Sequence, residues 1–315
     1  MTSAVVGIGL LAVAAGALVA RYVPISSHFA LYVVITVPLL MVAAPVAVVV
    51  LAWGRHRVLA GLAVLVTGAL LVVQLPWFVS ASPNPASVGV RTMTINMLYG
   101  HADAGALVHA ADQNADILMV QELTPEAVRR LSVAGIEKTF PYQALDARPG
   151  SAGVGVYSRH PVTASTRIAG YQLAMVSVRI RIPKVANEVS VLSVHLDAPW
   201  PRPIDGWQRD IARFPSTLAD VAAQAGKGAV LIGGDFNSTV DMHPFRQLLT
   251  NGFEDAASQA GSGRDFTYPA NKRYPPVLGI DHVLTRNATA VSTATVELKG
   301  SDHRALLATV MVPTG

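Results

Sequence analysis

The stretch Ala229-Val-Leu-Ile-Gly-Gly-Asp-Phe-Asn237 joins an apolar run to a small polar turn. Its first four residues, Ala229–Ile232, predict a short buried strand, and the glycine pair that follows predicts a tight turn at the end of that strand. Asp235 and Asn237 therefore stand where a strand leaves a sheet. A carboxylate in this position is usually a turn former or a helix cap. The rest of the chain decides whether it has a chemical role.

Polar or acidic residues also follow, or interrupt, apolar runs at five other places along the chain. These are Asn96, Gln121-Glu122, His195-Leu-Asp197, Asp281-His282 and Ser301-Asp302-His303. Each alone is weak evidence, because single histidines and carboxylates are common in turns and on surfaces. Six such sites with carboxylate, amide and imidazole side chains in one chain favour a catalytic cluster gathered from several strand ends.

Outward from these sites, residues 90–315 alternate short apolar strands with a few helices. The predicted strands are 91–97, 116–120, 153–158, 174–182, 188–195, 229–233, 279–285, 291–298 and 304–312. The predicted helices are 104–113, 125–133, 204–224 and 244–249. The alternation of apolar and polar residues is clearest in Ala174–Ile182. Many strands with few helices predict an α/β fold of two packed sheets covered by helices.

In this order, the polar sites resemble the endonuclease/exonuclease/phosphatase superfamily. It includes exonuclease-III-like repair nucleases, type I deoxyribonucleases, neutral sphingomyelinases and inositol polyphosphate 5-phosphatases. The resemblance rests on Asn96, Gln121-Glu122, His195-Leu-Asp197, Gly234-Asp-Phe-Asn237, Ile280-Asp-His282 and Ser301-Asp-His303, with the intermediate strand and turn Gly153–Pro161. It covers roughly residues 90–312. It implies the family's four-layer α/β sandwich, the DNase-I-like fold.

Phosphoester hydrolysis requires charge neutralisation, an activated water and a stabilised leaving oxygen. The resemblance implies Glu122 as the principal metal ligand, with Asp302 completing or sharing the metal shell. It implies that Asp235 orients or deprotonates the attacking water and is held by Asn237, whose amide also donates to the phosphoryl oxygens. Because the chain has no cysteine and its candidate ligands are oxygen and imidazole, we expect Mg²⁺ or Mn²⁺.

The resemblance also assigns the groups that contact the phosphate. His303 contacts the scissile phosphate, and Asp281 holds its imidazole in one tautomer, as carboxylate–histidine pairs do. His195 donates to the phosphate from the opposite side. Asn96 orients Asp235 or the metal ligands.

Four neighbouring residues have other interpretations. Asp197 is expected to be a turn or supporting residue, and His282 to point the other way along its strand from Asp281. Tyr157 either lines the site or packs as a strand aromatic. The family's nucleases often carry an acidic residue two positions after the first Asn, where this chain has Leu98. This departure argues against a second metal ligand from that strand.

Charge is distributed unevenly along the chain. Apolar residues make up 51% and charged residues 14%, which excludes a disordered chain. Residues 1–80 contain no Asp or Glu, and three uncharged stretches within them predict transmembrane helices. They are Ala4–Ala20, Phe29–Trp53 and Val58–Val79. Pro38 and Pro45 predict kinks in the second stretch. A transport path is not expected, because no ionisable residue lies within any of the three stretches.

The first span could instead be a cleaved signal peptide, because small residues close it. Its leading residues carry no positive side chain and two more spans follow, which favours an uncleaved helix. The basic loop Arg55-His56-Arg57 is predicted to be cytoplasmic by the positive-inside rule. Residues 1–79 are therefore a three-helix anchor, and 80–89 are an extended linker. The catalytic domain, 90–315, is expected outside the cytoplasm.

Two substrate classes fit a membrane-tethered domain. The first is a lipid-linked phosphate or pyrophosphate, because the tether is short and the domain has 21 Lys and Arg against 20 Asp and Glu. The layout resembles actinomycete membrane phosphatases associated with glycopeptide resistance, whose implied substrate is a polyprenyl pyrophosphate or a related cell-wall lipid carrier. The second is nucleic acid, which requires a basic, aromatic groove. The suggestive cluster is Arg264, Lys272, Arg273 and Tyr274.

A binding module with a relic site is a third interpretation, and the intact acidic and imidazole positions argue against it. The expected partners are the lipid bilayer and a phosphate ester. No obligate protein partner is inferred.

Overall fold

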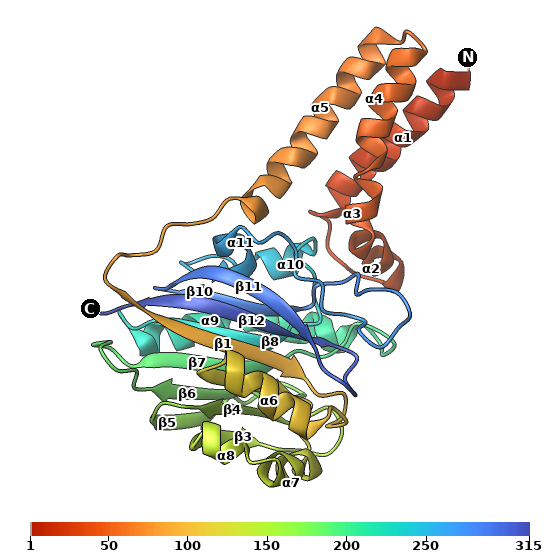
Figure 1. Cartoon of the computed structure of the whole chain (residues 1–315). Coiled ribbons are helices and arrows are strands. Elements are labelled where there is room, and N and C mark those ends of the chain that lie inside the picture. Colours follow the sequence, from red (N-terminus) through yellow and green to blue (C-terminus); the bar gives the residue numbers. More distant parts are fainter. Residues whose placement is uncertain (1) are drawn as a thin grey trace. The chain divides into compact units, whose positions relative to one another are not determined.

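The computed structural model describes residues 2–315, which divide into two compact units (Figure 1). One unit contains the chain up to Pro76 together with Val240–Arg246, and the other contains Trp77–Thr239 and Gln247–Gly315. The first unit is helical. The second carries all the strands found in the described residues.

Apolar helices make up the N-terminal part of the chain. They are α1 (Thr2–Ala20), α2 (His28–Ile35), α3 (Val37–Leu40), α4 (Ala43–Trp53), α5 (Arg57–Gln74) and the 3-10 turn η1 (Leu75–Phe78). Within the described residues, two continuous helices are long and apolar enough to cross a membrane, Thr2–Ala20 and Arg57–Phe78. The predicted span 29–53 is broken, because α2 and Val37–Trp53 meet at 52°. A third span exists only if this bent pair counts as one.

The break in this predicted span has a local cause. Pro38 has no backbone N–H and lies in the first turn of α3, where a proline is tolerated, so it begins a new helix instead of continuing α2. The hydroxyl of Thr36 donates to the carbonyl oxygens of Tyr32 and Val33, each at 2.9 Å, which favours a bend at this point. Pro45 likewise lies in the first turn of α4.

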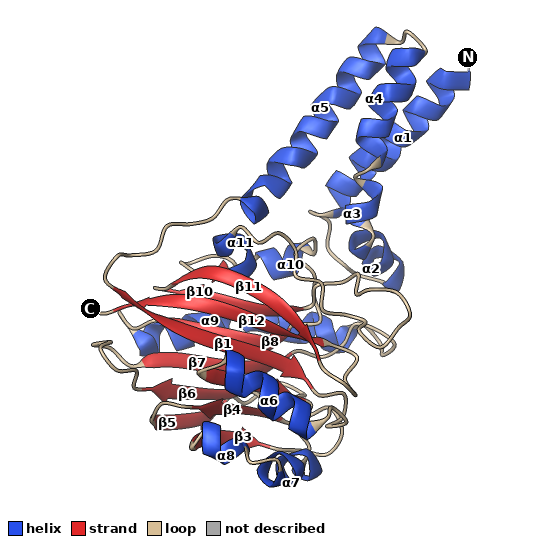
Figure 2. Cartoon of the chain, viewed as in Figure 1, coloured by secondary structure: helices blue, strands red, loops and turns tan. Residues whose placement is uncertain are grey.

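Two mixed six-stranded sheets form the body of the second unit (Figure 2). The first sheet has the order β11 (Thr289–Glu297), β12 (Arg304–Pro313), β1 (Ser87–Asn96), β2 (Ile117–Gln121), β4 (Val154–Ser158), β3 (Tyr142–Asp146). The second has the order β5 (Val162–Arg167), β6 (Val176–Ile180), β7 (Val189–His195), β8 (Val230–Asp235), β10 (Asp281–Arg286), β9 (Glu254–Asp255). The β1–β2 and β7–β8 pairs are parallel, and all the other pairs are antiparallel.

The helices that follow the anchor in the chain are α6 (Ala104–Asn114), α7 (Pro125–Val133), α8 (Ile136–Thr139), α9 (Asp205–Ala225), α10 (His243–Arg246) and α11 (Ala256–Ala260), of which α10 belongs to the first unit. Side chains cap the starts of two of them: Asp103 accepts the N–H of Ala106 at α6, and Thr124 accepts that of Ala127 at α7. One buried cluster fills the space between the two sheets, and a second lies between the first sheet and α6 and α7. Helix α9 packs on the second sheet, on β7 and β8. These layers agree with the expected α/β sandwich.

All nine predicted strands and all four predicted helices are present, with ends that differ by up to a few residues. The three strands that the sequence did not predict, β3, β5 and β9, lie at sheet edges. An edge strand that is solvent-exposed has no buried face, so its sequence lacks the apolar alternation by which strands are recognised. The predicted linker also ends early, because β1 begins at Ser87.

Strand register brings the predicted site residues to one edge of the two sheets. Asp235, the last residue of β8, pairs with His195 at the end of β7 and with Asp281 at the start of β10. In the other sheet, Asn96 at the end of β1 pairs with Gln121 at the end of β2. This is the edge at which β1, β2, β7 and β8 end and the antiparallel strands β10 and β12 begin.

Candidate active site at the strand ends

Asp235 lies at the centre of the cluster and is only 2% exposed. Its Oδ1 accepts the backbone N–H of Asn237 at 2.8 Å, and its Oδ2 accepts the side-chain amide of Asn96 at 3.1 Å. Two imidazole nitrogens face the same Oδ2: His195 Nε2 at 3.6 Å and His303 Nε2 at 3.8 Å. Both distances exceed a normal hydrogen bond, so neither ring nitrogen is hydrogen-bonded to this oxygen.

Burial raises the pKa of the Asp235 carboxyl, since an ion loses its hydration in the protein interior. The charge of His303 opposes this shift, and the nearby Asp281 carboxylate adds to it. A carboxyl with a raised pKa is a stronger base than a free aspartate. It is therefore suited to accept a proton from water.

His303 is fixed from two sides. Its Nδ1 donates to Asp281 Oδ2 at 2.8 Å, and its backbone N–H donates to the hydroxyl of Ser301 at 2.9 Å. That hydroxyl in turn donates to the carbonyl oxygen of Asn96, which links the start of β12 to the end of β1. Burial lowers the pKa of His303, but the carboxylates of Asp281 and Asp235 outweigh burial and raise it to about 10. The ring is therefore an imidazolium at neutral pH, and its Nε2 proton can be donated to an anion.

Glu122 occupies a second corner of the cluster, one residue beyond β2. Its backbone is left-handed, with φ of 54°, which turns the side chain toward the end of β1. There Oε1 accepts the Asn96 amide at 3.1 Å, and Oε2 accepts the backbone N–H of Tyr99. Asn96 therefore bridges the carboxylates of Glu122 and Asp235. Burial raises the pKa of nearby Asp302, and the Glu122 carboxylate contributes to the shift.

The donor set fits a hard divalent cation. Asp235, Asp281 and His303 offer ligand atoms within 4.8 Å of one another. Asp281 Oδ1 is buried without a hydrogen-bond partner, as expected of an oxygen that binds a cation or a ligand. As an imidazolium, however, His303 has no lone pair for a metal. The carboxylates, Glu122 and Asp302 among them, are therefore the better ligands, because oxygen ligands suit Mg²⁺ or Mn²⁺.

His195 and Asn237 complete the group on the side of the second sheet. His195 Nδ1 donates to the carbonyl oxygen of Ser151 at 3.1 Å, which orients Nε2 toward Asp235. Asn237 has a left-handed backbone, with φ of 49°, and its side-chain amide donates to the carbonyl oxygen of Leu196 at 2.9 Å. One of its two amide protons is thus committed to holding the loop after β7.

The neighbours of the cluster separate into supporting and core residues. Asp197 Oδ1 accepts the N–H of Ala198 at 2.9 Å and pairs with Arg202 at 3.1 Å, so it shapes the turn after β7. His282 points away from the cluster, as expected from strand alternation. Tyr157 is 1% exposed and belongs to the core cluster beneath α6 and α7.

One aromatic beside the site was not predicted from the sequence. The ring of Tyr268 lies 4.9 Å from that of His303, and the N–H of Ala270 donates to the carbonyl oxygen of Asp302 at 2.6 Å. Tyr268 belongs to a loop and to no motif. Only its aromatic type in a Pro-rich segment could have drawn attention to it.

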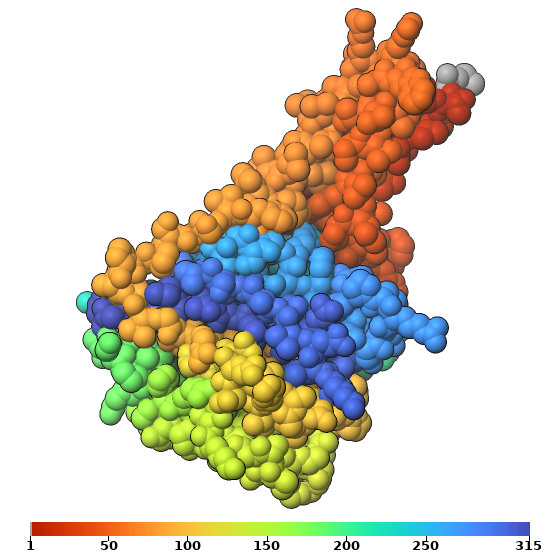
Figure 3. All heavy atoms as spheres, viewed as in Figure 1, coloured from red at the N-terminus to blue at the C-terminus, as the bar shows by residue number. Residues whose placement is uncertain are grey.

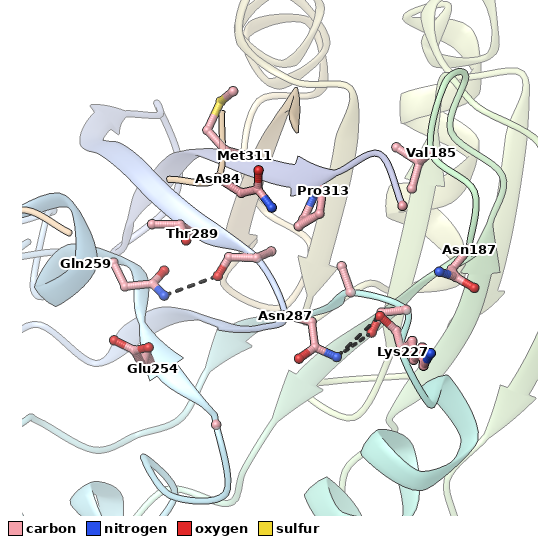
Figure 4. Close-up of a pocket in the computed structure, with 15 residues that line it drawn as sticks. Asn84, Val185, Asn187, Lys227, Glu254, Gln259, Asn287, Thr289, Met311 and Pro313 are labelled. Atoms are coloured by element: carbon pink, nitrogen blue, oxygen red, sulfur yellow. Dashed lines mark hydrogen bonds between the residues drawn. The ribbon is translucent and has the colours of Figure 1, made fainter. Parts of the chain in front are cut away.

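A cavity of about 580 Å³ opens at the opposite end of the strands (Figure 4). Lys227 and Gly228, which precede β8, line it together with Asn287 and Pro313. Asn287 donates its amide to the carbonyl oxygens of Gly226, Lys227 and Gly228 at 3.2–3.4 Å, which closes one wall. This cavity lies at the far ends of β7 and β8 from His195 and Asp235, so it is separate from the cluster.

The fold and the cluster together define a class of protein: a two-sheet α/β sandwich with a carboxylate–imidazole site at its strand ends. The model of the Endonuclease/Exonuclease/phosphatase family matches residues 93–303. The chain belongs to this family, and its site is that of a hydrolase acting on phosphoester bonds.

Solved structures show the same fold. Humanized D. rerio TDP2 superposes with a TM-score of 0.59 at 16% identity, over 70% of this chain and 98% of that one. An endonuclease/exonuclease/phosphatase from Bacteroides vulgatus gives 0.57 at 16% identity, over 71% and 98%. D. rerio TDP2 complexed with single-strand DNA product gives 0.58 at 18% identity, over 70% and 98%. No curated protein matches the chain in sequence.

Proposed function

We propose that the chain is a membrane-anchored, divalent-metal-dependent phosphoesterase that hydrolyses a lipid-linked phosphate or pyrophosphate at the outer face of the membrane. The observation that carries the chemistry is the surroundings of Asp235. Two imidazoles approach its Oδ2 at 3.6 and 3.8 Å without closing hydrogen bonds. The amide of Asn96 connects it to Glu122. A base, two imidazoles and a metal ligand are thus gathered in one cluster.

Asp235 acts on the attacking water, since its raised pKa makes it a base and the Asn237 N–H fixes its orientation. His303 donates from Nε2 to the phosphoryl oxygens, and Asp281 holds the imidazolium in position through Nδ1. His195 approaches from the other side, and because its Nδ1 proton is already donated to the carbonyl oxygen of Ser151, a hydrogen bond from Nε2 to the phosphate requires a second proton on the ring. Its ring cannot turn while Nδ1 is bound to the carbonyl oxygen of Ser151.

Glu122 is the principal metal ligand, and Asp302 contributes to the same shell. A bound Mg²⁺ or Mn²⁺ would neutralise charge on the phosphate and lower the pKa of a bound water. Asn96 supports this role from the protein side, because it holds the Glu122 carboxylate while it holds Asp235. The backbone N–H of Tyr99 fixes the other Glu122 oxygen.

The lipid substrate is supported by the anchor and by the charge of the domain. Apolar helices precede the catalytic unit, and only residues 79–86 separate Phe78 from β1. A chain extends at most about 3.6 Å per residue, so this tether keeps the catalytic unit within reach of the bilayer. The near balance of basic and acidic residues does not favour a polyanion. The layout is similar to that of the actinomycete glycopeptide-resistance membrane phosphatases.

The test is a release assay with the full chain in detergent micelles, with and without Mg²⁺. Polyprenyl pyrophosphate, phospholipids, inositol phosphates and plasmid DNA are compared side by side. We expect metal-dependent release from the polyprenyl substrate that Asp235→Asn abolishes. If a chelator leaves the activity of the wild-type chain unchanged, the metal-dependent mechanism is wrong.

A tethered extracytoplasmic nuclease is the second candidate. One observation favours it: D. rerio TDP2, which shares the fold, has been solved with single-strand DNA product. Arg264 is only partly exposed, whereas Lys272, Arg273 and Tyr274 are exposed, so the basic cluster at the surface is smaller than the sequence suggested. In the assay above, faster release from DNA than from any lipid substrate would select this candidate.

The side of the membrane is tested separately. The basic loop Arg55–Arg57 and an odd number of spans predict that residues 80–315 are extracytoplasmic. Alkaline phosphatase fused after Gly315 should then be active, because it requires the oxidising compartment. An inactive fusion, together with an active cytoplasmic reporter at the same position, would reverse the topology.

A further inference from the structure

Exposed apolar side chains of the catalytic unit gather on three loops around the cluster. Among residues 80–315, eight large hydrophobic side chains are exposed, and four of them lie on loops that begin at the site. These four are Tyr99 (48% exposed), Trp200 (55%), Tyr274 (54%) and Val277 (54%). We call them the apolar rim. Singly exposed hydrophobics need no explanation, whereas a concentration beside a catalytic cluster indicates a binding surface.

Hydrogen bonds attach each loop to the site. The N–H of Tyr99 donates to Glu122 Oε2. The loop that carries Trp200 starts at Leu196, whose carbonyl oxygen accepts the Asn237 amide at 2.9 Å. The loop that carries Tyr274 and Val277 is closed at its base by Tyr268 and Leu278, which exchange backbone hydrogen bonds of 2.8 and 2.9 Å.

The base of this third loop also touches the site directly. Tyr268 packs on the His303 ring, and Ala270 donates to the Asp302 carbonyl oxygen. In Figure 3 the loop that carries Tyr274 and Val277 is the blue protrusion at the right of the molecule. Each of the three loops that carry the apolar rim is therefore joined to the catalytic groups at its base.

Two of the three loops also carry basic residues, on a domain that is otherwise nearly balanced in charge. Residues 98–102, 198–204 and 269–280 contain no Asp or Glu. They contain Arg202, Lys272 and Arg273, all exposed. Basic residues beside aromatics are typical of surfaces that meet the anionic headgroups of a bilayer, where the rings lie at the interface.

The backbone of the two longer loops has few hydrogen-bond donors. Three prolines, Pro199, Pro201 and Pro203, surround Trp200, and Pro275 and Pro276 follow Tyr274. A proline has no N–H, so such loops lose less hydrogen bonding than others when they leave water for the bilayer interface. A nucleic-acid surface would instead use backbone N–H groups and polar side chains for the phosphates. An aliphatic residue such as Val277 also offers no ring for a base to stack on.

We propose that the apolar rim inserts into the interface of an anionic bilayer and places the catalytic cluster over a phosphate ester that remains in the membrane. This inference rests on the proposed function, because it requires a substrate held at the bilayer surface. The apolar side chains would enter the boundary between headgroups and acyl chains, and Lys272 and Arg273 would pair with lipid phosphates. The reacting phosphate then need not leave the membrane.

The test uses the absence of cysteine from the chain, which makes single labels unambiguous. The full chain carrying Val277→Cys is labelled with an environment-sensitive fluorophore and reconstituted into vesicles of phosphatidylglycerol and phosphatidylcholine. Part of the phosphatidylcholine carries bromine near the carbonyl end of its acyl chains. Lys227→Cys is the matched control, because Lys227 is exposed at the opposite end of β8.

Since interfacial side chains lie about 5–10 Å below the headgroup boundary, bromine should quench the label at position 277 at least about twofold more than at 227. Each basic residue contributes about fivefold to affinity for an anionic surface, so Lys272→Glu with Arg273→Glu should reduce the quenching. Lys227→Glu should not. Equal quenching at the two labelled positions would overturn the proposal.

Quenching does not depend on turnover, so the two proposals can fail separately. Selective quenching without release from any lipid substrate would keep the rim and overturn the proposed function. Release from a lipid substrate without selective quenching would keep the proposed function and overturn the insertion of the apolar rim. A label at 277 that responds to a single-stranded oligonucleotide, and not to brominated lipid, would assign the apolar rim to nucleic acid.

Discussion

Two buried histidine–carboxylate pairs begin from adjacent residues of β10 and extend to opposite sides of the strand. Asp281 Oδ2 accepts from His303 Nδ1 at 2.8 Å, and His282 Nδ1 donates to Asp255 Oδ2, also at 2.8 Å. All four residues are at most 6% exposed. In residue types, distance and burial the pairs are nearly alike.

They differ in what the second nitrogen of each ring meets. His282 Nε2 donates to the carbonyl oxygen of Ser238 at 2.9 Å, so both of its protons are used within the protein. His303 Nε2 lies 3.8 Å from Asp235 and 4.0 Å from Asp302, beyond hydrogen-bond distance. We call the first the closed pair and the second the open pair. A buried pair by itself indicates structure as often as function, and the uncommitted donor is what distinguishes the open pair.

The largest effect should come from the carboxylate that faces the open pair. Asp235→Asn keeps the size of the side chain and one of its two acceptor oxygens, but removes the base. Loss of general-base assistance should lower kcat about 10²–10⁴-fold, measured as release from the best substrate. Metal affinity should change little, because Glu122 and Asp302 are the proposed ligands, and thermal stability should change little, because the closed pair is intact. Near-wild-type turnover would remove the water-activating role from Asp235.

Breaking the closed pair should affect stability instead. Asp255→Asn leaves His282 buried without its anion and should lower the free energy of unfolding by about 3–5 kcal/mol. Urea titration in detergent micelles, followed by intrinsic fluorescence, measures this loss. The rate per folded molecule should stay unchanged, because Asp255 contacts no catalytic group. A loss of rate with unchanged stability would mean that the closed pair has a catalytic role and not a structural one.

The open pair itself should behave as one functional unit. Removal of a well-placed donor costs about 10²–10³-fold in rate, which is the expectation for His303→Ala. Asp281→Ala should cost less, because Asp281 acts through His303. The double variant should be hardly slower than His303→Ala alone. Fully additive losses, with both proteins folded, would falsify the pairing.

The sequence predicted the types and positions of the site residues better than their contacts. Asn96, Asp235 and Asp281 could be found because each stands at a strand end, and strand ends are visible as breaks in apolar runs. The distinction between open and closed pairs could not be found in this way. It depends on Ser238 and Asp255, which lie 44 and 27 residues from His282 in the chain and meet it only in the folded structure.

The same limit applies to the fold. Strands with a buried face, such as β6, repeat apolar residues at every second position and were predicted. The edge strand β5 is exposed along most of its length, and its sequence gives no such signal. The bend at Pro38 was expected, but the full break of the helix was not, because it depends on how Thr36 bonds back to the preceding turn.

A smaller effect is expected where the open pair meets the metal ligands. Glu122→Gln keeps one carbonyl oxygen but removes the charge, so Mg²⁺ or Mn²⁺ affinity should fall about 10–100-fold, the size of effect seen when metal-site partners are lost. Titration calorimetry of the full chain measures this affinity, and turnover should fall with it. Asp255→Asn, at the closed pair, should bind metal like the wild type. Unchanged affinity in Glu122→Gln would transfer the principal ligand role to another carboxylate.

The smallest expected effect is a pH dependence of stability that arises from the closed pair. Burial lowers the pKa of His282, but the hydrogen bond and charge of Asp255 outweigh burial and raise it above the usual 6.5. Between these two pKa values the folded state holds a proton that the unfolded state has lost. The contribution of His282 is therefore fully present below pH 6.5 and is lost as the pH rises through its folded-state pKa.

His282→Gln isolates this contribution from that of His303, whose raised pKa acts in the same direction. The difference in unfolding free energy between the wild type and His282→Gln should be largest in mild acid. Above pH 6.5 it should shrink by at most about 1.4 kcal/mol per pH unit, the value for one proton. Urea titrations at a series of pH values, in the same detergent, measure it. A difference that grows as the pH rises would mean that His282 is neutral in the folded protein, and the closed pair would then be a neutral hydrogen bond without an ion pair.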